Sequence, residues 1–128
     1  MKLGYTILYV GDVKATMNFY EKAFSLKPKF LHESGQYGEM DTGETTLSFT
    51  ELNSSKPKSL DFLKVTDSKS SYPVEIAFTT KDVSSAYKKA MSEGCQNVSE
   101  PEQKPWGQVV SYVLDLNGFL VEICSPIS

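Results

Sequence analysis

The sequence uses one pattern of strand, turn and helix signals twice. Residues 3–10 are rich in β-forming residues, and Asp12 then begins a stretch in which apolar residues recur with helical period. That first apolar stripe consists of Val13, Met17, Tyr20 and Phe24. Adding 70 to a residue number in the first half gives its partner in the second, so Asp12 corresponds to Asp82 and Val13 to Val83. The repeat predicts one module of a strand, a helix and three strands, used twice.

The repeat also sets the expected boundaries of the elements. In the first half we expect strands at residues 3–10, 30–33, 38–41 and 45–50, and a helix that begins after Asp12 and ends near Ser25, before Pro28. In the second half we expect a strand at residues 73–79 and a helix that begins after Asp82 and stops at Gly94. We therefore expect a single domain over residues 1–128, made of a module at 1–52, a linker at 53–71 and a module at 72–128.

The C-terminal region gives the strongest local signal. Two runs of apolar and β-branched residues, 106–115 and 119–124, flank Asn117 and Gly118, and an Asn-Gly pair supplies the positive φ angles of a tight hairpin. Glu122 lies between Val121 and Ile123 in the second run. Because side chains alternate along a strand, its carboxylate points away from the face of its apolar neighbours.

Composition excludes several classes of partner. The formal net charge is -3 and the chain contains no arginine, which argues against nucleic acid and against bidentate capture of carboxylates or phosphates. No apolar run approaches the roughly 20 residues of a membrane span, so we expect no membrane partner. Residues 1–5 carry no apolar signal core, and Cys95 and Cys124 are too few for a disulfide framework. We expect a cytoplasmic protein with two free cysteines.

Three motifs and the repeat resemble the vicinal oxygen chelate superfamily, which includes glyoxalase I, bleomycin-resistance proteins and extradiol dioxygenases. The motifs are the Val-Gly-Asp-Val step at 10–13, the Asn-Phe-Tyr-Glu-Lys run at 18–22 and the closing segment at 115–122. The resemblance implies an α+β fold in which two tandem βαβββ modules curl a mixed sheet around a shared cavity. It also implies a homodimer.

The resemblance further implies four metal-ligand positions, one in the first and one in the last strand of each module. In this sequence they are Tyr5, Ser48, Glu75 and Glu122. Metal-dependent members place histidine and glutamate there, because imidazole and carboxylate hold a divalent ion and leave sites open for substrate. Only Glu122 is of the usual type, so we expect no metal and no other cofactor. If a divalent metal is bound, Glu75 and Glu122 are its expected ligands.

Seven side chains are candidates for binding a ligand in the implied cavity. They are Tyr5, Ser48, Phe49, Glu75, Trp106, Tyr112 and Glu122. Carboxylates attract a cation, and aromatic rings stack on a flat or cationic compound. The carboxylates and the aromatic residues also have structural interpretations. Glu75 and Glu122 are then remnants of a lost metal site, and the aromatic residues are packing residues.

Two functions from different classes fit these residues. The first resembles the metal-independent bleomycin-resistance-like members and binds a small aromatic or cationic compound without performing a reaction. The alternative is a metal-dependent lyase or isomerase of glyoxalase type that uses Glu122 and Glu75, with Glu122 as its catalytic residue. We favour binding, because Tyr5 and Ser48 replace the expected histidine and glutamate.

Overall fold

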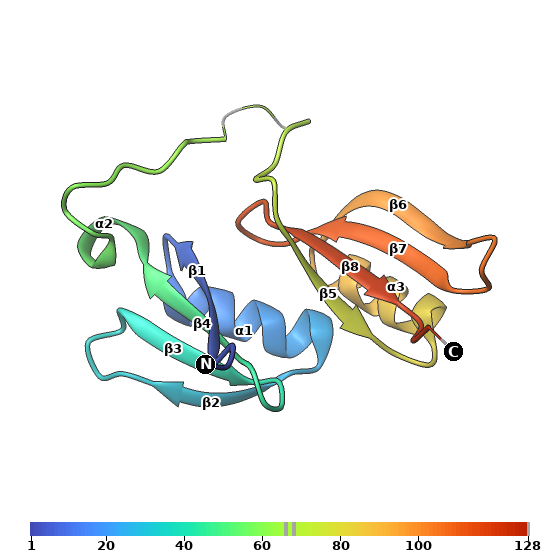
Figure 1. Ribbon diagram of the computed structural model, residues 1–128, viewed down its shortest axis with the longest axis horizontal. Coiled ribbons are helices and arrows are strands. Elements are labelled where there is room, and N and C mark those ends of the chain that lie inside the picture. The colour runs from blue at the N-terminus through green and yellow to red at the C-terminus, as the bar shows by residue number, and fades with distance from the viewer. Residues whose placement is uncertain (66, 68, 128) are drawn as a thin grey trace. The chain divides into compact units, whose positions relative to one another are not determined.

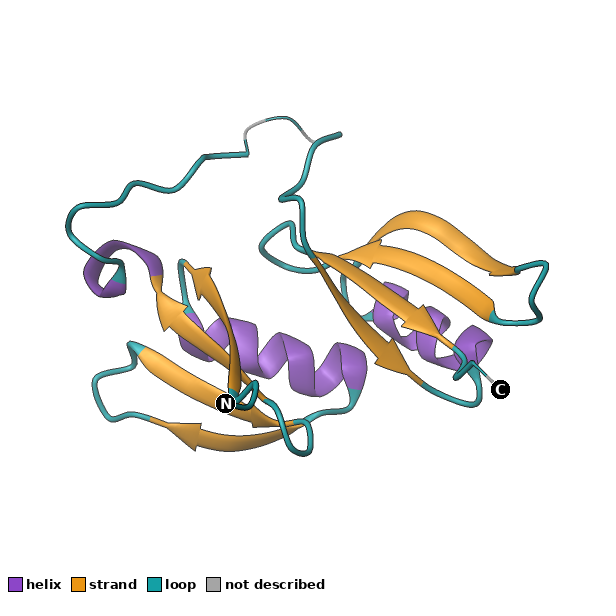
Figure 2. Cartoon of the chain, in the orientation of Figure 1, coloured by secondary structure: helices purple, strands orange, loops and turns teal. Residues whose placement is uncertain are grey.

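The computed structural model describes residues 1–65, 67 and 69–127. The chain divides into two compact units, unit 1 (Met1–Leu63) and unit 2 (Lys64–Ser128). Each unit holds a four-stranded sheet with one long helix against one of its faces (Figures 1 and 2). The predicted α+β fold with two tandem modules is confirmed.

Unit 1 follows the predicted order of one strand, one helix and three strands. Its elements are β1 (Tyr5–Val10), α1 (Val13–Phe24), β2 (Lys27–Leu31), β3 (Tyr37–Asp41), β4 (Thr46–Glu51) and the short α2 (Leu52–Ser55). The strand order across the sheet is β1-β4-β3-β2, and β1 runs parallel to β4 while the other neighbours are antiparallel.

Unit 2 repeats this arrangement. Its elements are β5 (Glu75–Thr79), α3 (Val83–Ser92), β6 (Gln96–Gln103), β7 (Val109–Leu114) and β8 (Leu120–Cys124). The strand order is β5-β8-β7-β6, with β5 parallel to β8. Ile7 pairs with Ser48 in unit 1, and Ala77 pairs with Glu122 in unit 2. Ser48 and Glu122 therefore occupy equivalent positions in the registers of the two units.

Both long helices begin where the sequence predicts, because an aspartate caps each N-terminus. Asp12 accepts a hydrogen bond from the backbone N–H of Ala15 at 2.9 Å, and Asp82 accepts one from that of Ser85 at 3.0 Å. Each carboxylate satisfies a backbone donor that the first helical turn leaves unpaired. Ser25 follows α1 in the left-handed region, at φ 58°, which ends the helix before β2.

Three expectations about the strands need correction. The second strand is not at residues 30–33 but at Lys27–Leu31, where Pro28 costs little because β2 is an edge strand beside a register shift. The equivalent edge strand β6, which contains Pro101, carried too weak a pattern to be placed from sequence. The positive φ of the last hairpin falls on Gly118 alone of the Asn-Gly pair.

The hairpin between β7 and β8 closes through a carboxylate instead of a two-residue turn. Asp115 accepts hydrogen bonds from the backbone N–H groups of Asn117 and Phe119, each at 2.8 Å. Its own backbone N–H donates to the carbonyl of Phe119 at 2.9 Å. Aspartate side chains commonly organise turns in this way, and this turn places Glu122 opposite Tyr112 in the ladder.

Each sheet has one face that packs on its helix, and we call the opposite one its helix-free face. The helix-facing residues include Val10, Met40 and Phe49 in unit 1 and Val113, Val121 and Ile123 in unit 2, each at most 2% exposed. Because side chains alternate along a strand, Ser48 and Glu122 lie on the helix-free faces. The core of each unit thus lies between sheet and helix.

Gly38 on β3 faces α1 so closely that no side chain fits. A Cβ atom there would overlap the sulfur of Met17 and lie 3.1 Å from Cγ1 of Val13. We expect Gly38→Ala to lower the free energy of unfolding by about 1–3 kcal/mol, because both neighbours are buried and overpacking strains them. Denaturant unfolding measures this change. Gly4→Ala, where a Cβ meets nothing within 4 Å, is the matched control, and equal losses for both variants would contradict the expectation.

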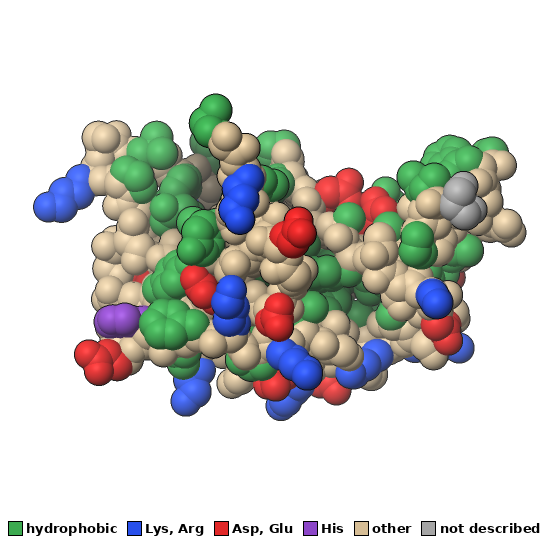
Figure 3. Space-filling view, turned by 60° about the horizontal axis from the view of Figure 1, so that its bottom comes forward, with side chains coloured by type: hydrophobic (Ala, Val, Ile, Leu, Met, Phe, Trp, Pro, Cys, Tyr) green, Lys and Arg blue, Asp and Glu red, His purple; other side chains and the backbone are tan. Residues whose placement is uncertain are grey.

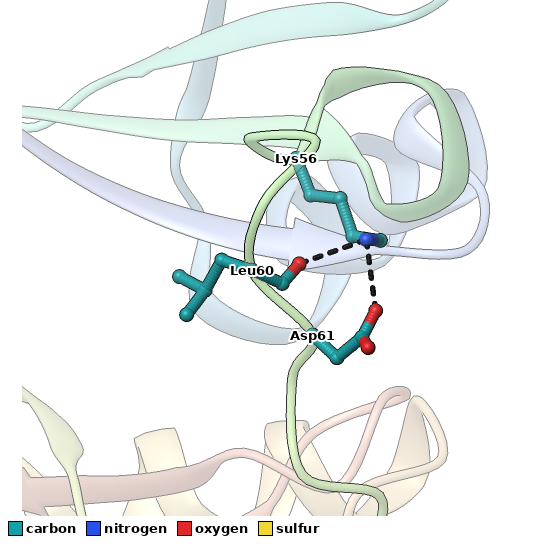
Figure 4. A network of polar contacts seen from close by, with 3 residues as sticks. All are labelled: Lys56, Leu60 and Asp61. Carbon is teal, nitrogen blue, oxygen red and sulfur yellow. Dashed lines mark hydrogen bonds and ion pairs between the residues drawn. The ribbon is translucent and has the colours of Figure 1, made fainter.

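The segment after β4 folds back on unit 1. Lys56 donates from Nζ to the carbonyl oxygen of Leu60 at 2.8 Å and pairs with Asp61 at 3.1 Å (Figure 4). The rings of Phe62 and Tyr9 lie 4.7 Å apart between centroids. The predicted linker at 53–71 therefore begins with α2 and these ordered contacts, and residues 66 and 68 of it lie outside the described residues. No helix in the described part of the chain is long and apolar enough to cross a membrane.

Candidate functional site

Glu122 is the centre of a polar cluster on the helix-free face of unit 2. It lies on β8, with Ala77 of β5 on one side and Tyr112 of β7 on the other. Its carboxylate is half-buried, and it raises the pKa values of its neighbours Glu75, Tyr112 and Cys124. The structure thus brings together three of the predicted site residues, Glu75, Tyr112 and Glu122.

The hydrogen bond between two carboxyl groups requires a proton. Partial burial raises the pKa of Glu75, and the hydrogen bond and negative charge of Glu122 raise it further. Glu75 therefore holds its proton more tightly than a free glutamate does. In its protonated form the pair carries one negative charge.

The raised pKa of Glu75 predicts how stability depends on pH. The folded state holds this proton more tightly than the unfolded state, where the pKa has its ordinary value of 4.5. The stabilisation is complete below that value, and we expect it to be lost as pH rises through the raised pKa. Glu75→Gln removes the titrating group. As pH rises through the raised pKa, the free energy of unfolding of this variant should therefore fall less than that of wild type. Denaturant unfolding at a series of pH values tests this, with Glu93→Gln as control, and parallel curves for wild type and Glu75→Gln would contradict it.

Tyr112 and Cys124 remain protonated donors at neutral pH. Burial first, and then the hydrogen bond and charge of Glu122, raise the pKa of Tyr112 to about 12. The same causes raise the pKa of Cys124 to about 11. Because neither group ionises near neutrality, both present a hydrogen to Glu122.

Trp106, before β7, is held by Gln108, which the sequence did not single out. The indole Nε1–H donates to Oε1 of Gln108 at 2.9 Å. Nε2 of Gln108 donates to the backbone carbonyl of Ser125 at 2.9 Å. Trp106 is 64% exposed, so this predicted site residue is held in position by hydrogen bonds more than by burial.

Unit 1 carries a second polar cluster on its own helix-free face. The phenol of Tyr37 donates to Oε2 of Glu39 at 2.7 Å and lies 3.1 Å from Oγ of Ser48. Burial raises the pKa of Tyr37, and Glu39 and Tyr5 raise it further, while the hydrogen bond with Ser48 acts in the opposite direction. Tyr5 and Ser48, both predicted site residues, therefore meet around Tyr37.

Phe49 does not belong to either cluster. It is completely buried, and its ring packs against Tyr20 of α1 with 4.8 Å between centroids. Since Ser48 lies on the helix-free face, its neighbour Phe49 must point to the helix. The expectation that Phe49 lines a ligand site is corrected: it is a core residue of unit 1.

Four side chains of the clusters were missed or undervalued in the sequence. They are Gln108 and Cys124 in unit 2, and Tyr37 and Glu39 in unit 1. Gln108 is hydrogen-bonded to Trp106, and Tyr37 is hydrogen-bonded to Glu39 and to Ser48. The sequence could have indicated Cys124. It lies two residues beyond Glu122 on β8, and alternation along a strand places such residues on the same face. His32, the only histidine, is exposed beyond β2 and bonds to Ser34.

The donors at the implied metal positions do not fit a divalent first-row ion. Glu122 raises the pKa of Glu75, and Ser48 is fully buried beside Tyr37. Among the described residues, no group of three or more histidine, cysteine, aspartate and glutamate side chains is placed to hold a metal. Such ions prefer imidazole and thiolate, or several carboxylates free of protons.

Basic side chains do not form a continuous patch on the face drawn in Figure 3, where lysines and acidic residues lie interspersed. Ion pairs join Lys56 to Asp61 and Lys104 to Glu102, at 3.1 and 3.9 Å. Neither pair involves Glu75 or Glu122. The negative charge of the unit 2 cluster is therefore not neutralised by an ion pair within the described residues.

Comparisons with known proteins agree with this fold. The uncharacterized protein YraH of Bacillus subtilis (strain 168) is 26% identical over 130 residues, which cover 96% of this chain and 97% of YraH. A glyoxalase-related enzyme from Fulvimarina pelagi superposes with a TM-score of 0.82 over 98% of this chain and 88% of that one, at 17% identity. TioX from Micromonospora sp. ML1 superposes with a TM-score of 0.75 over 98% of both chains, at 16% identity. At these identities the two solved structures show a shared fold.

The family is shown by a match that runs through both modules. The model of the Glyoxalase/Bleomycin resistance protein/Dioxygenase superfamily matches residues 2–123. This range includes every strand and helix of the two units except the last residue of β8. The chain belongs to the glyoxalase/bleomycin resistance protein/dioxygenase superfamily.

Proposed function

We propose that this protein binds a small aromatic or cationic compound, without a metal ion, at Glu122 on the helix-free face of unit 2. The observation that carries the proposal is the half-buried carboxylate of Glu122, which lies beside Tyr112 and near Glu75 and has no ion-pair partner among the described residues. An uncompensated charge is costly to bury. A bound cation would supply the missing partner.

The groups around Glu122 favour a cation over an anion. Glu75, Tyr112 and Cys124 add no positive charge, because each is neutral when protonated. A positively charged ligand gains Coulomb attraction and meets aromatic faces at Tyr112 and Trp106. An anion would be repelled by the carboxylate.

Three small compounds test the proposal by isothermal titration calorimetry. Tetramethylammonium is a cation without a ring, N-methylquinolinium is a flat aromatic cation, and quinaldate is a flat aromatic anion. We expect both cations to bind and the aromatic cation to bind more tightly, with no binding of quinaldate. Binding of quinaldate as tight as that of N-methylquinolinium would contradict the proposal, and so would the absence of binding by either cation.

A lyase or isomerase of glyoxalase type is the second candidate. The proton-sharing pair of Glu75 and Glu122 favours it, because two carboxyl groups with different proton affinities suit proton abstraction next to a carbonyl. In this alternative the two residues hold a divalent metal, or Glu122 acts as the base. The test is turnover of a thiol adduct of methylglyoxal in the presence of added magnesium, manganese, nickel or zinc. Turnover by wild type that is lost in Glu122→Gln would support this alternative over pure binding.

The homodimer that the resemblance implies stays a prediction. One chain has a mass of 14.2 kDa. Light scattering on the purified protein should give twice this value, and the value for one chain would contradict it.

A further inference from the structure

Asn117 and Gly118 form a reactive pair in the turn between β7 and β8. The backbone nitrogen of the residue that follows an asparagine can attack the carbon of the side-chain amide. This attack is least hindered when that residue is glycine, which has no Cβ. The other asparagines of the chain precede Phe19, Ser54 and Val98. Asn117 is therefore the asparagine whose following residue hinders cyclisation least.

The pair lies where water reaches it. Leu116, the residue before the pair, is 52% exposed, and Asn117 and Gly118 are each half-buried. Water is the second reactant, because it opens the cyclic imide that the attack forms. Gly118 adopts φ 87°, a left-handed conformation that a side chain would strain. The glycine that makes the pair reactive is thus also the residue that the turn requires.

Both backbone polar groups of Gly118 are hydrogen-bonded. Its N–H donates to the carbonyl oxygen of Asp115 at 3.2 Å, and its own carbonyl oxygen accepts a hydrogen bond from Oγ of Ser71. Beside this bond, the ring of Tyr72 packs on that of Phe119 with 4.9 Å between centroids. We call Ser71 and Tyr72 the clasp. It joins the segment before β5 to the turn, within unit 2.

The conformation held in this way opposes the reaction. The nitrogen of Gly118 must lose its proton before it attacks Asn117, yet its N–H is bonded to Asp115. The carboxylate of Asp115 also holds the N–H groups of Asn117 and Phe119, each at 2.8 Å. Cyclisation therefore needs the turn to open. Local opening costs less free energy than global unfolding, so the folded chain reaches the reactive conformation without unfolding.

We infer that Asn117 is a site of spontaneous covalent modification, and that the clasp restricts the reaction to the moments when the turn opens. The Gly118 nitrogen forms a bond to Cγ of Asn117, the bond from Cγ to the side-chain amide nitrogen breaks, and ammonia leaves with the proton that Gly118 loses. Water then adds to either carbonyl of the imide and opens it, which yields aspartate or isoaspartate. The reaction needs no ligand, so the inference goes beyond the proposed function.

The modification loosens the hairpin that carries Glu122. Either product adds a negative charge close to the carboxylate of Asp115, and isoaspartate also lengthens the backbone of the turn by one carbon. The turn that Asp115 organises through two backbone N–H groups then loses its geometry. We expect the modified chain, separated by anion exchange, to unfold at a lower denaturant concentration than the unmodified chain. Equal midpoints for the two forms would contradict this consequence.

Mass spectrometry of the full chain, aged at mildly alkaline pH, tests the inference. Fragmentation of tryptic peptides assigns each conversion of amide to acid to a particular asparagine. Asn97 is the internal control, because Val98 hinders its cyclisation. We expect modification at Asn117 and not at Asn97, and about 10-fold or more faster modification in guanidinium chloride, where the turn is unfolded. Equal rates in the folded and unfolded chains would overturn the inference, and so would an unmodified Asn117 in the unfolded chain.

A variant of the clasp tests its role directly. Ser71→Ala removes the hydroxyl that holds Gly118, and we expect modification at Asn117 about 2- to 10-fold faster than in wild type, which corresponds to the loss of one hydrogen bond. Ser70→Ala changes an exposed neighbouring serine and is the matched control, with the rate of wild type. The acceleration in Ser71→Ala should disappear in guanidinium chloride, because both chains are then unfolded. A rate equal to that of wild type in folded Ser71→Ala would overturn the role of the clasp, and so would an acceleration that persists in the unfolded chain.

Discussion

Glu122→Gln is expected to weaken the binding of N-methylquinolinium about 10- to 100-fold, as measured by calorimetry. The substitution preserves size and removes the charge that attracts the cation. Two unit charges about 4 Å apart attract by about 1 kcal/mol in water and about 4 kcal/mol near a protein surface, and a loss between these limits corresponds to this range of affinity. Tetramethylammonium should lose a similar factor, because its only strong attraction is to the same charge.

The control for this variant is Glu93→Gln, which removes one negative charge at the end of α3. Glu93→Gln changes the net charge by the same amount as Glu122→Gln but leaves the unit 2 cluster intact. We therefore expect its affinity for the cation to be close to that of wild type. A loss as large as that of Glu122→Gln would mean that overall charge, and not this carboxylate, attracts the ligand. Unchanged affinity in Glu122→Gln would place the ligand elsewhere.

Phe49→Ala is expected to lower the free energy of unfolding by about 3–5 kcal/mol, the usual cost of truncating a fully buried phenylalanine. Phe49 is 0% exposed and packs against Tyr20 between the sheet and α1. Denaturant unfolding followed by circular dichroism measures the loss. A cost of this size would consume much of the stability of a domain of ordinary size.

The matched control lies on the other face of the same sheet. Phe30 on β2 is 47% exposed, and Phe30→Ala is expected to cost about 1 kcal/mol or less. Similar losses for the two variants would contradict the assignment of Phe49 to the core. If Phe49→Leu bound N-methylquinolinium more weakly without losing stability, Phe49 would have to be assigned to the ligand site after all.

The repeat made much of the fold predictable from the sequence. The offset of 70 residues relates β1 to β5 and α1 to α3, and both helix caps stand where the sequence places Asp12 and Asp82. The period of two along a strand then puts Glu122 on the face away from Val121 and Ile123. These features depend on residues close together in the sequence, so sequence patterns predict them.

The predictions that were wrong concern features that depend on contacts between strands or on competing local signals. The Asn-Gly pair indicated a two-residue turn, but Asp115 organises a longer one by accepting from two backbone N–H groups. Phe49 was grouped with Ser48 although neighbours on a strand face opposite sides, an error that strict alternation would have prevented. The bond between Trp106 and Gln108 depends on the geometry of the turn, which the residue types alone do not determine.

The most direct test of the account is calorimetric titration of N-methylquinolinium into protein that has been stripped of metal with a chelator. We predict that the stripped protein binds the cation, that added magnesium, manganese, nickel or zinc does not tighten binding, and that Glu122→Gln weakens it. Binding that appears only after one of these metals is added would contradict the metal-independent site at Glu122. It would favour the lyase or isomerase of glyoxalase type instead.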